Sequence, residues 1–219
     1  MEKSFVAGMK PGHILQDSEK HRVVGWAMKP EEALAFFRSL NKKTITFVGY
    51  SSQYEDKDAM LAIVKETLEK YSPKDHVVNI GVTMGGIGAA YPLAKSMGFQ
   101  TTGIVSYLAI QYADAISADV DHICFIADPD WGGRNPNTKV LSPTSLAIVH
   151  CSDILIGIGG NEISRDEMLA AKELGRPVKF FPAEISHQWA IQRAKKAHQP
   201  VPVSFWGAAH AAILGQASE

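Results

Sequence analysis

Three glycine-rich stretches in this chain have the residue types and positions to bind an anion. They are Gly49-Tyr50-Ser51-Ser52, Gly81 to Gly88 and Gly157 to Asn161, and each follows an apolar run of strand length. Backbone N–H groups in such turns, together with the N-termini of the helices that follow, suit a phosphate or another anion. The alternative interpretation is that these glycines only permit tight turns and close packing of helices.

Neither common phosphate-binding fingerprint is present in these turns. No Gly-Lys-Ser/Thr follows any of them, which excludes a Walker loop. The spacing of Gly86-x-Gly88 is too short for the dinucleotide fingerprint. In addition, no acidic residue stands at the end of the second strand, where it would bind a ribose hydroxyl. The residues that we predict to contact a ligand are small residues of the turns: Gly49, Ser51, Ser52, Gly81, Thr83, Gly85, Gly86, Gly88, Gly159, Gly160 and Asn161.

The stretch from Asp153 to Pro182 is typical of a strand, a glycine turn, a helix and a second strand. A unit of this size with a parallel strand at each end is a βαβ crossover. In such sheets ligands bind beyond the carboxyl ends of the strands, so the pattern predicts that Gly159 to Glu167 lie at the mouth of a site.

The whole chain alternates strand-like and helix-like segments. Six runs are typical of buried strands: 44–50, 77–80, 102–105, 122–127, 154–158 and 178–181. Helices are predicted at about 30–40, 56–71, 88–97, 107–118, 142–149, 163–174 and 184–197, with a further short strand at 21–26 and a last strand and short helix in the tail from Val201. This alternation predicts an α/β fold, a three-layer, Rossmann-like, doubly wound sheet of about six largely parallel strands. We expect one domain over 1–219, with 1–40 as an N-terminal extension and 44–183 as the nucleotide-binding core.

Composition narrows the class of partner. The formal net charge of −1, without a basic run, argues against nucleic acid and against a membrane surface. No apolar stretch is long enough to cross a bilayer, and MEKSFVAGMK lacks the apolar core of a signal peptide, so a cytoplasmic location is expected. The two cysteines, Cys124 and Cys151, are expected to be buried thiols in a reducing compartment. No metal-ligand spacing occurs, and neither a metal nor a cofactor is predicted.

A long polar loop follows the strand at 122–127. It runs from Asp128 to Asn137, is rich in glycine and proline, and is of the length that more often serves function than connection alone. Trp131 could stack on a base when the loop closes over a ligand. Arg134 is a candidate phosphate contact, and a solvated loop arginine is the alternative.

Two segments resemble the SLOG superfamily, which includes the cytokinin-activating phosphoribohydrolases once called lysine decarboxylases. The first segment is Gly85-Gly86-Ile87-Gly88 with Ala94, Gly98 and Thr102 to Val105. The second is Asp153 to Ile156 with Gly159-Gly160, Glu167, Ala171, Gly175 and Pro177-Val178, and it also resembles the related nucleoside deoxyribosyltransferases. The resemblance covers about residues 44–183.

The resemblance implies proteins that cleave or exchange N-glycosidic bonds of nucleosides or nucleotides, or bind such ligands without catalysis. It carries the family's glutamate onto Glu167, where a carboxylate could stabilise or attack an oxocarbenium-like centre. Glu162, in the turn itself, is a rival, and either acid could instead only interact with the helix dipole. The chain departs from the phosphoribohydrolases at Asn161-Glu162-Ile163, where they carry a glycine and a threonine, and at Arg134, where they carry an arginine-lysine pair.

Two functions of different classes follow. The first is binding of a nucleotide-like ligand with hydrolysis of the N-glycosidic bond of a nucleoside monophosphate, in which Glu167, Glu162 and Arg134 are the candidate catalytic residues. The second is a non-catalytic module that binds or senses a nucleotide derivative. A weaker alternative is a flavodoxin-like or TIR-like protein whose glycine turns are architectural. The expected partner is a nucleotide or a phosphorylated sugar, and the resemblance implies a homo-oligomer.

Overall fold

The computed structural model describes residues 10–17 and 22–214, which form one eight-stranded sheet. In chain order the strands are β1 (Ile14–Asp17), β2 (Arg22–Met28), β3 (Lys43–Gly49), β4 (His76–Ile80), β5 (Gln100–Ser106), β6 (His122–Ile126), β7 (Ile154–Ile158) and β8 (Val178–Phe181). Across the sheet their order is β1-β2-β6-β5-β4-β3-β7-β8. β1 is antiparallel to β2, and every other neighbouring pair is parallel.

The strand order reverses at β3. From β3 the chain moves outward to β4, β5 and β6, and then returns through a helix to β7 on the other side of β3. This is the arrangement of a doubly wound, Rossmann-like sheet, in which the carboxyl ends of all parallel strands lie on one edge. The three glycine turns predicted to share an edge follow β3, β4 and β7, which are neighbours in the sheet.

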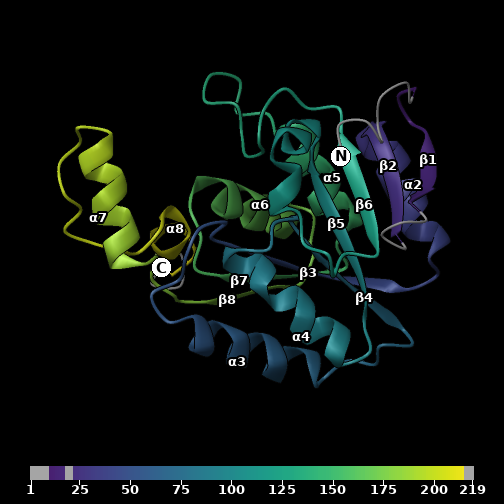
Figure 1. Ribbon diagram of the computed structural model, residues 1–219, viewed down its shortest axis with the longest axis horizontal. Helices are drawn as coiled ribbons and strands as arrows, with labels where there is room; N and C mark the ends of the chain where they lie inside the picture. The colour runs from purple at the N-terminus through teal and green to yellow at the C-terminus, as the bar shows by residue number, and fades with distance from the viewer. Residues whose placement is uncertain (1–9, 18–21, 215–219) are drawn as a thin grey trace.

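Helices cover both faces of the sheet (Figure 1). One face carries α3 (Lys57–Leu68), the 3₁₀ helix η1 (Gly86–Ala90) and α4 (Tyr91–Ser96). The other carries α2 (Pro30–Ser39), α5 (Pro143–Cys151), α6 (Glu162–Glu173) and α8 (Ala208–Leu214). The 3₁₀ segment η2 (Tyr107–Ala115) follows β5, and α7 (His187–Lys196) lies beyond β8, at the outer side of the molecule.

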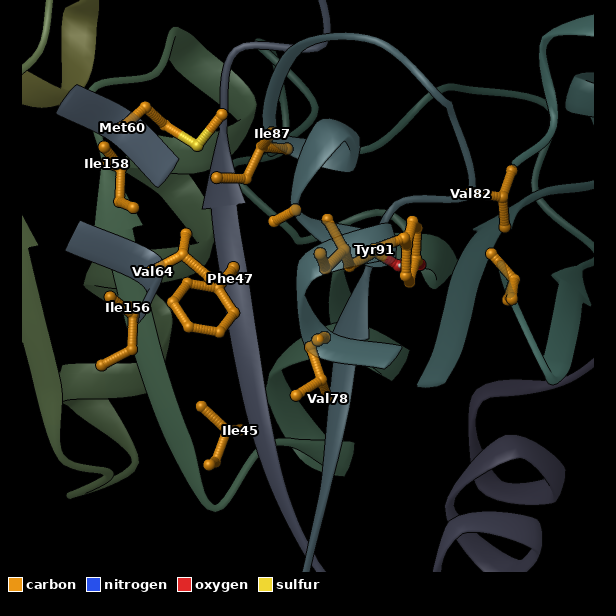
Figure 2. Packing of buried hydrophobic residues seen from close by; sticks show 14 of the residues in the cluster. Ile45, Phe47, Met60, Val64, Val78, Val82, Ile87, Tyr91, Ile156 and Ile158 are labelled. Carbon is orange, nitrogen blue, oxygen red and sulfur yellow. The ribbon is translucent and has the colours of Figure 1, made fainter. Parts of the chain in front are cut away.

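Alternate residues of each strand supply two apolar cores. On the α3 side, Phe47 and Ile156 pack with Met60 and Val64 of α3 (Figure 2). On the opposite side, Val48 and Leu155 belong to a second cluster with residues of α5 and α6. A parallel sheet buried on both faces explains why its strands are nearly continuous apolar runs in the sequence.

The six predicted strands and the predicted Rossmann-like class are confirmed. The sheet of the described residues has seven mutually parallel strands rather than about six, because the segment predicted at 21–26 forms β2, and β1 adds an antiparallel edge. Over the described residues 201–214 the predicted strand of the tail does not form: around Trp206 the chain makes one isolated bridge to Glu184, and then α8 begins. Pro200 and Pro202 cannot donate backbone hydrogen bonds, which disfavours a strand there.

The prediction of a helix over 107–118 is confirmed only in part. Residues Tyr107–Ala115 form 3₁₀ turns, broken at Tyr112, which has non-helical φ −119° and ψ 39°. Ile116 is extended and forms a bridge with Thr83, and the N–H of Ser117 donates to the carbonyl of Val82. These pairings with the segment after β4 take the backbone groups that a continuing helix would need.

Residues 1–9, 18–21 and 215–219 lie outside the described residues, and with them most of the predicted N-terminal start and the last residues of the tail. The described part of 1–40 contributes β1, β2 and α2 to the sheet and its second layer. A single domain with a core at 44–183 stays a prediction. Within 10–17 and 22–214, no helix is both long and apolar enough to cross a membrane. Cys124 and Cys151 are buried and unpaired, as predicted.

Candidate functional site

A cavity of about 410 Å³ opens at the carboxyl edge of β3, β4 and β5. Its walls come from the ends of these strands, from η2, from the 128–142 loop and from the first turns of α5 and α6. Its lining residues are Thr46, Phe47, Val48, Gly49, Ser51, Asn79, Ile80, Gly81, Val82, Thr83, Ile87, Ile104, Val105, Ala109, Tyr112, Ala115, Ile116, Trp131, Thr144, Ile148, Ile163, Ser164 and Glu167. A volume in this range and a largely apolar wall are typical of a small-molecule site.

Glu167 is the one carboxyl residue in this lining. Its side chain is 3% exposed, and its Oε1 accepts a hydrogen bond of 2.7 Å from the hydroxyl of Ser145. Burial raises the pKa of Glu167 to about 8, with a smaller contribution in the same direction from Asp166, while the Ser145 bond lowers it. Burial therefore favours the neutral carboxylic acid at pH 7, a form that can donate a hydrogen bond.

The 128–142 loop is fixed to the site by backbone donors. The N–H of Gly133 donates to Ser145 Oγ at 2.7 Å, and the N–H of Arg134 donates to Asp166 Oδ2 at 2.8 Å. Fully buried Asp128 accepts from the N–H of Asp130 at one oxygen and, at 2.8 Å, from the N–H of Thr144 at the other. The loop is thus attached to the first turns of both α5 and α6.

Thr144 presents a hydroxyl without a hydrogen-bond partner. The side chain is 2% exposed, lines the cavity, and its Oγ1 is buried with no donor or acceptor in reach among the described residues. A buried hydroxyl left unpaired costs stability, so such groups normally have a protein, water or ligand partner.

The base of the cavity is polar and already hydrogen-bonded. Asn79 of β4 donates to Thr46 Oγ1 at 3.3 Å and accepts from Thr102 Oγ1 at 3.2 Å. Ser152, after α5, lies 2.6 Å from Thr46 through its hydroxyl. This network orients the amide of Asn79 beneath the cavity and holds three strands and the end of α5 together.

Two aromatic side chains lie at the mouth. Tyr112 of η2 is 60% exposed and Trp131 of the loop is 48% exposed, and both line the cavity. Their ring centroids are 5.9 Å apart, with an interplanar angle of 49°. The break in η2 at Tyr112 turns this ring toward the loop, and the pair offers aromatic faces to a planar ligand.

Five residues predicted to form the site line this cavity: Gly49, Ser51, Gly81, Thr83 and Glu167. The remaining candidates lie outside its lining: Ser52, Gly85, Gly86, Gly88, Gly159, Gly160, Asn161, Glu162 and Arg134. The contacts predicted between these residues and a ligand stay predictions.

Packing explains the glycines of the second turn. Gly86 has φ +56°, and a Cβ there would lie 2.1 Å from the carbonyl oxygen of Tyr50. At Gly88 it would lie 1.7 Å from the carbonyl oxygen of Thr83. By contrast, a Cβ at Gly81 would meet no atom within 4 Å. Gly86 lets η1 approach the turn after β3, and Gly88 lets η1 pack against Thr83 in the turn after β4, which is the architectural role left open by the sequence.

The C-terminal tail covers the turn after β7. The N–H of Ala209 donates to the carbonyl of Gly160, and the N–H of Gly207 donates to the Tyr50 hydroxyl at 2.8 Å. That hydroxyl in turn donates to the carbonyl of Ala183 at 3.0 Å. Gly159, with φ +55°, packs against the Tyr50 ring.

Arg134 and Glu162 lie away from Glu167. The Arg134 guanidinium pairs with Glu173 at 2.8 Å and donates to the carbonyl of Lys139. Glu162 is exposed in the first turn of α6. Thr144, Ser145 and Asn79 are site residues that the sequence did not reveal. Ser142 is the N-cap of α5, and its hydroxyl accepts from the N–H of Ser145; a serine directly before Pro143 was the signal that could have placed Thr144 and Ser145 at the ligand-facing edge.

The strand order and crossovers define the class, a Rossmann-like α/β protein with a cavity at the carboxyl edge of its sheet.

No protein-family model matches the chain, and no curated protein matches it significantly. Several solved structures are similar to parts of it, among them the following three. The Moco carrier protein from Chlamydomonas reinhardtii is 19% identical over 64% of this chain and 76% of its own, with a TM-score of 0.45. The structural-genomics target TM1055 is 20% identical over 62% of this chain and 72% of its own, with a TM-score of 0.44.

The third similar structure is DNA processing protein A from Streptococcus pneumoniae, 15% identical over 80% of this chain and 62% of its own, with a TM-score of 0.45. Similarities at these identities and TM-scores carry no argument about function. The SLOG resemblance lies in residues and spacing, and the Rossmann-like fold that it implies is the one observed.

Proposed function

We propose that the chain binds a nucleotide-like small molecule in the cavity at the carboxyl edge of β3 to β5, with the base of the ligand beside Glu167. The observation that carries the proposal is a buried carboxyl group with a raised pKa in a largely apolar wall. A neutral acid in such a wall can donate to a ring nitrogen or carbonyl oxygen without the cost of a buried charge.

The same group has the chemistry of a general acid for N-glycosidic cleavage. As the C1′–N bond breaks, its electron pair goes to the base, and the proton of Glu167 goes to the base nitrogen. A water molecule then adds its oxygen to C1′, and the proton released by that water returns Glu167 to its neutral form. Below pH 8 the protonated form of Glu167 can act as a general acid, whereas a nucleophile would require the carboxylate form.

Non-catalytic binding is the second candidate, and one observation favours it. Within the described residues, the cavity has no second carboxyl group and no histidine that could activate water. The ligand-binding half of the proposal does not depend on such a group.

The test is a thermal-shift screen with nucleosides and nucleoside monophosphates, followed by chromatographic detection of free base. A ligand at 100 times its Kd stabilises the fold by about 2.7 kcal/mol. If the chain is catalytic, the wild type should release free base. Glu167→Gln should lose this release and keep the thermal shift. Glu66→Gln, an exposed position on α3, is the matched control. If Glu162→Gln rather than Glu167→Gln stops release, the assignment of Glu167 is wrong, and a flat screen overturns binding altogether.

A further inference from the structure

A second cavity, of about 410 Å³, lies between α7, at the outer side of the molecule (Figure 1), and the segment that follows this helix. We call it the tail cavity. It shares no lining residue with the cavity at the carboxyl edge of the sheet, and its lining comes mainly from residues 185–207, beyond the part of the chain that resembles the SLOG superfamily. Its volume is in the range of a small-molecule site.

Three aromatic side chains line the tail cavity, and neighbouring rings hold two of them in place. Phe205 stacks on His187, with centroids 3.9 Å apart and an interplanar angle of 22°. Trp206 stacks on His210, at 4.4 Å and 26°. Trp189, the third, projects from α7. Because packing within the protein positions these rings, a planar group can bind against them at a small cost in conformational entropy.

Arg193 gives the tail cavity a positive charge that no acid in the lining neutralises. It is the one charged lining residue, and its guanidinium carbon lies 5.2 Å from the centroid of the Trp189 ring. Among the described residues, its side chain has no ion pair. No aspartate or glutamate occurs in 185–214, and the acids next to lining residues in the chain, Glu162 and Glu184, are not in the lining.

This arrangement favours one particular kind of anion. A guanidinium whose face lies on an aromatic ring keeps its N–H edge available, and that edge matches the two oxygens of a carboxylate. A phosphate dianion would need a second cation, and the lining has no other lysine, arginine or histidine within the described residues. Asn161, predicted from the sequence to contact a ligand, adds an amide to this lining, and its side chain makes no capping bond to α6.

We propose that the tail cavity is a second binding site, which takes a small carboxylic acid with a planar, apolar body. The carboxylate pairs with Arg193, and the body packs on the rings of Trp189 and Trp206. This inference is independent of the proposed function, because the two cavities have no lining residue in common.

Matched pairs of compounds test the charge and the body of the ligand separately. Calorimetric titrations at pH 7.5 compare phenylacetate, 3-phenylpropionate and 2-naphthoate with their primary amides and with acetate. We expect at least one aromatic acid to bind about tenfold or more tightly than its amide and than acetate. The inference is wrong if none of the three acids binds, or if the amides bind as tightly as the acids. Neither result bears on the nucleoside screen of the carboxyl-edge cavity.

Variants on α7 test the location. Arg193 is exposed, so Arg193→Gln should keep the fold, weaken binding of the acid about tenfold and leave binding of the amide unchanged. Arg193→Lys keeps the charge without the planar fork, so its affinity should lie between the two. Lys195→Gln removes an exposed charge of the same helix outside the lining and should bind the acid within about twofold of wild type. An equal loss in Arg193→Gln and Lys195→Gln would indicate only diffuse attraction and would contradict the site.

Tryptophan fluorescence gives a second readout of the location. Phenylacetate should change the emission of wild type and of Trp131→Phe, whose altered ring belongs to the other cavity. The change should be lost in the double variant Trp189→Phe/Trp206→Phe, which removes both indoles of the tail cavity and keeps aromatic walls. The opposite pattern would place the acid in the carboxyl-edge cavity and overturn this inference.

Discussion

The hydroxyl of Ser145 donates a hydrogen bond of 2.7 Å to Oε1 of Glu167, and its oxygen accepts one of 2.7 Å from the N–H of Gly133. One side chain of α5 thus connects the buried acid of α6 with the loop that carries Trp131. Because Ser145 has a single hydrogen and gives it to Glu167, the acidic proton of Glu167 resides on the other oxygen, Oε2.

We expect Ser145→Ala to lower stability and to loosen the loop. The change leaves Glu167 and the N–H of Gly133 without their partners inside the protein, which should reduce the free energy of unfolding by roughly 1–3 kcal/mol. Urea denaturation measures the loss, and hydrogen exchange of residues 130–137 should accelerate. Ser39→Ala, which removes an exposed hydroxyl bonded to the carbonyl of Phe36, is the control and should change little. Equal protection of the loop in Ser145→Ala would contradict the proposed connection.

The raised pKa of Glu167 predicts how stability depends on pH. Between the ordinary pKa of 4.5 and the folded value of about 8, the native state binds a proton that the unfolded state has lost. Stability contributed by this group is therefore fully present below pH 4.5 and declines as the pH rises to 8, by at most about 1.4 kcal/mol per pH unit.

Glu167→Gln isolates this contribution, because the amide still accepts from Ser145 and does not titrate. The difference in unfolding free energy between Glu167→Gln and wild type should shift in favour of the variant from pH 5 to pH 8. Asp166 and Arg165 on α6 itself, and Asp128 in the loop, are common to both proteins. Urea denaturation at the two pH values measures the difference, and parallel curves would show that Glu167 does not titrate in this range.

Alanine substitutions at two glycines of the turn from Gly81 to Gly88 should differ in their effect on stability. Gly86→Ala should cost about 2–3 kcal/mol, because its φ of +56° disfavours a side chain and the new Cβ collides with the carbonyl of Tyr50. Gly81→Ala has open space and should leave stability within about 0.5 kcal/mol of wild type.

Gly81→Leu should fill the cavity and abolish the ligand-induced thermal shift while the protein stays folded. A stable Gly86→Ala protein that has lost binding would instead support the anion-binding interpretation of that turn.

The sequence predicted the fold better than the site, for a physical reason. Strands buried on both faces must be apolar runs, and capping residues such as Asp56 and Ser142 mark helix starts. The order of the elements can therefore be predicted from short stretches of sequence. The cavity depends on contacts between distant segments. Nothing near Thr144 in the chain shows that its hydroxyl lacks a partner, and nothing near Gly86 shows that the carbonyl of Tyr50 lies where a Cβ would be.

The segment 107–118 illustrates the same limit. Its apolar spacing is helical, but the backbone of Ile116 and Ser117 pairs with the segment after β4, a contact that sequence periodicity does not reveal. The result is the break at Tyr112, which places that ring on the cavity opposite Trp131.

The Tyr50 hydroxyl should hold the C-terminal tail on the sheet edge. It accepts from the N–H of Gly207 and donates to the carbonyl of Ala183; burial raises the pKa of Tyr50, while the hydrogen bond from Gly207 lowers it. Tyr50→Phe removes both bonds and keeps the ring, so the free energy of unfolding should fall by about 1–2 kcal/mol, and exchange at residues 205–210 should accelerate. Tyr71→Phe, just after the C-terminal end of α3, is the control. Because the tail covers Gly160 rather than the cavity, affinity for a nucleoside should be unchanged in Tyr50→Phe, and a loss of affinity would mean that the tail belongs to the binding site.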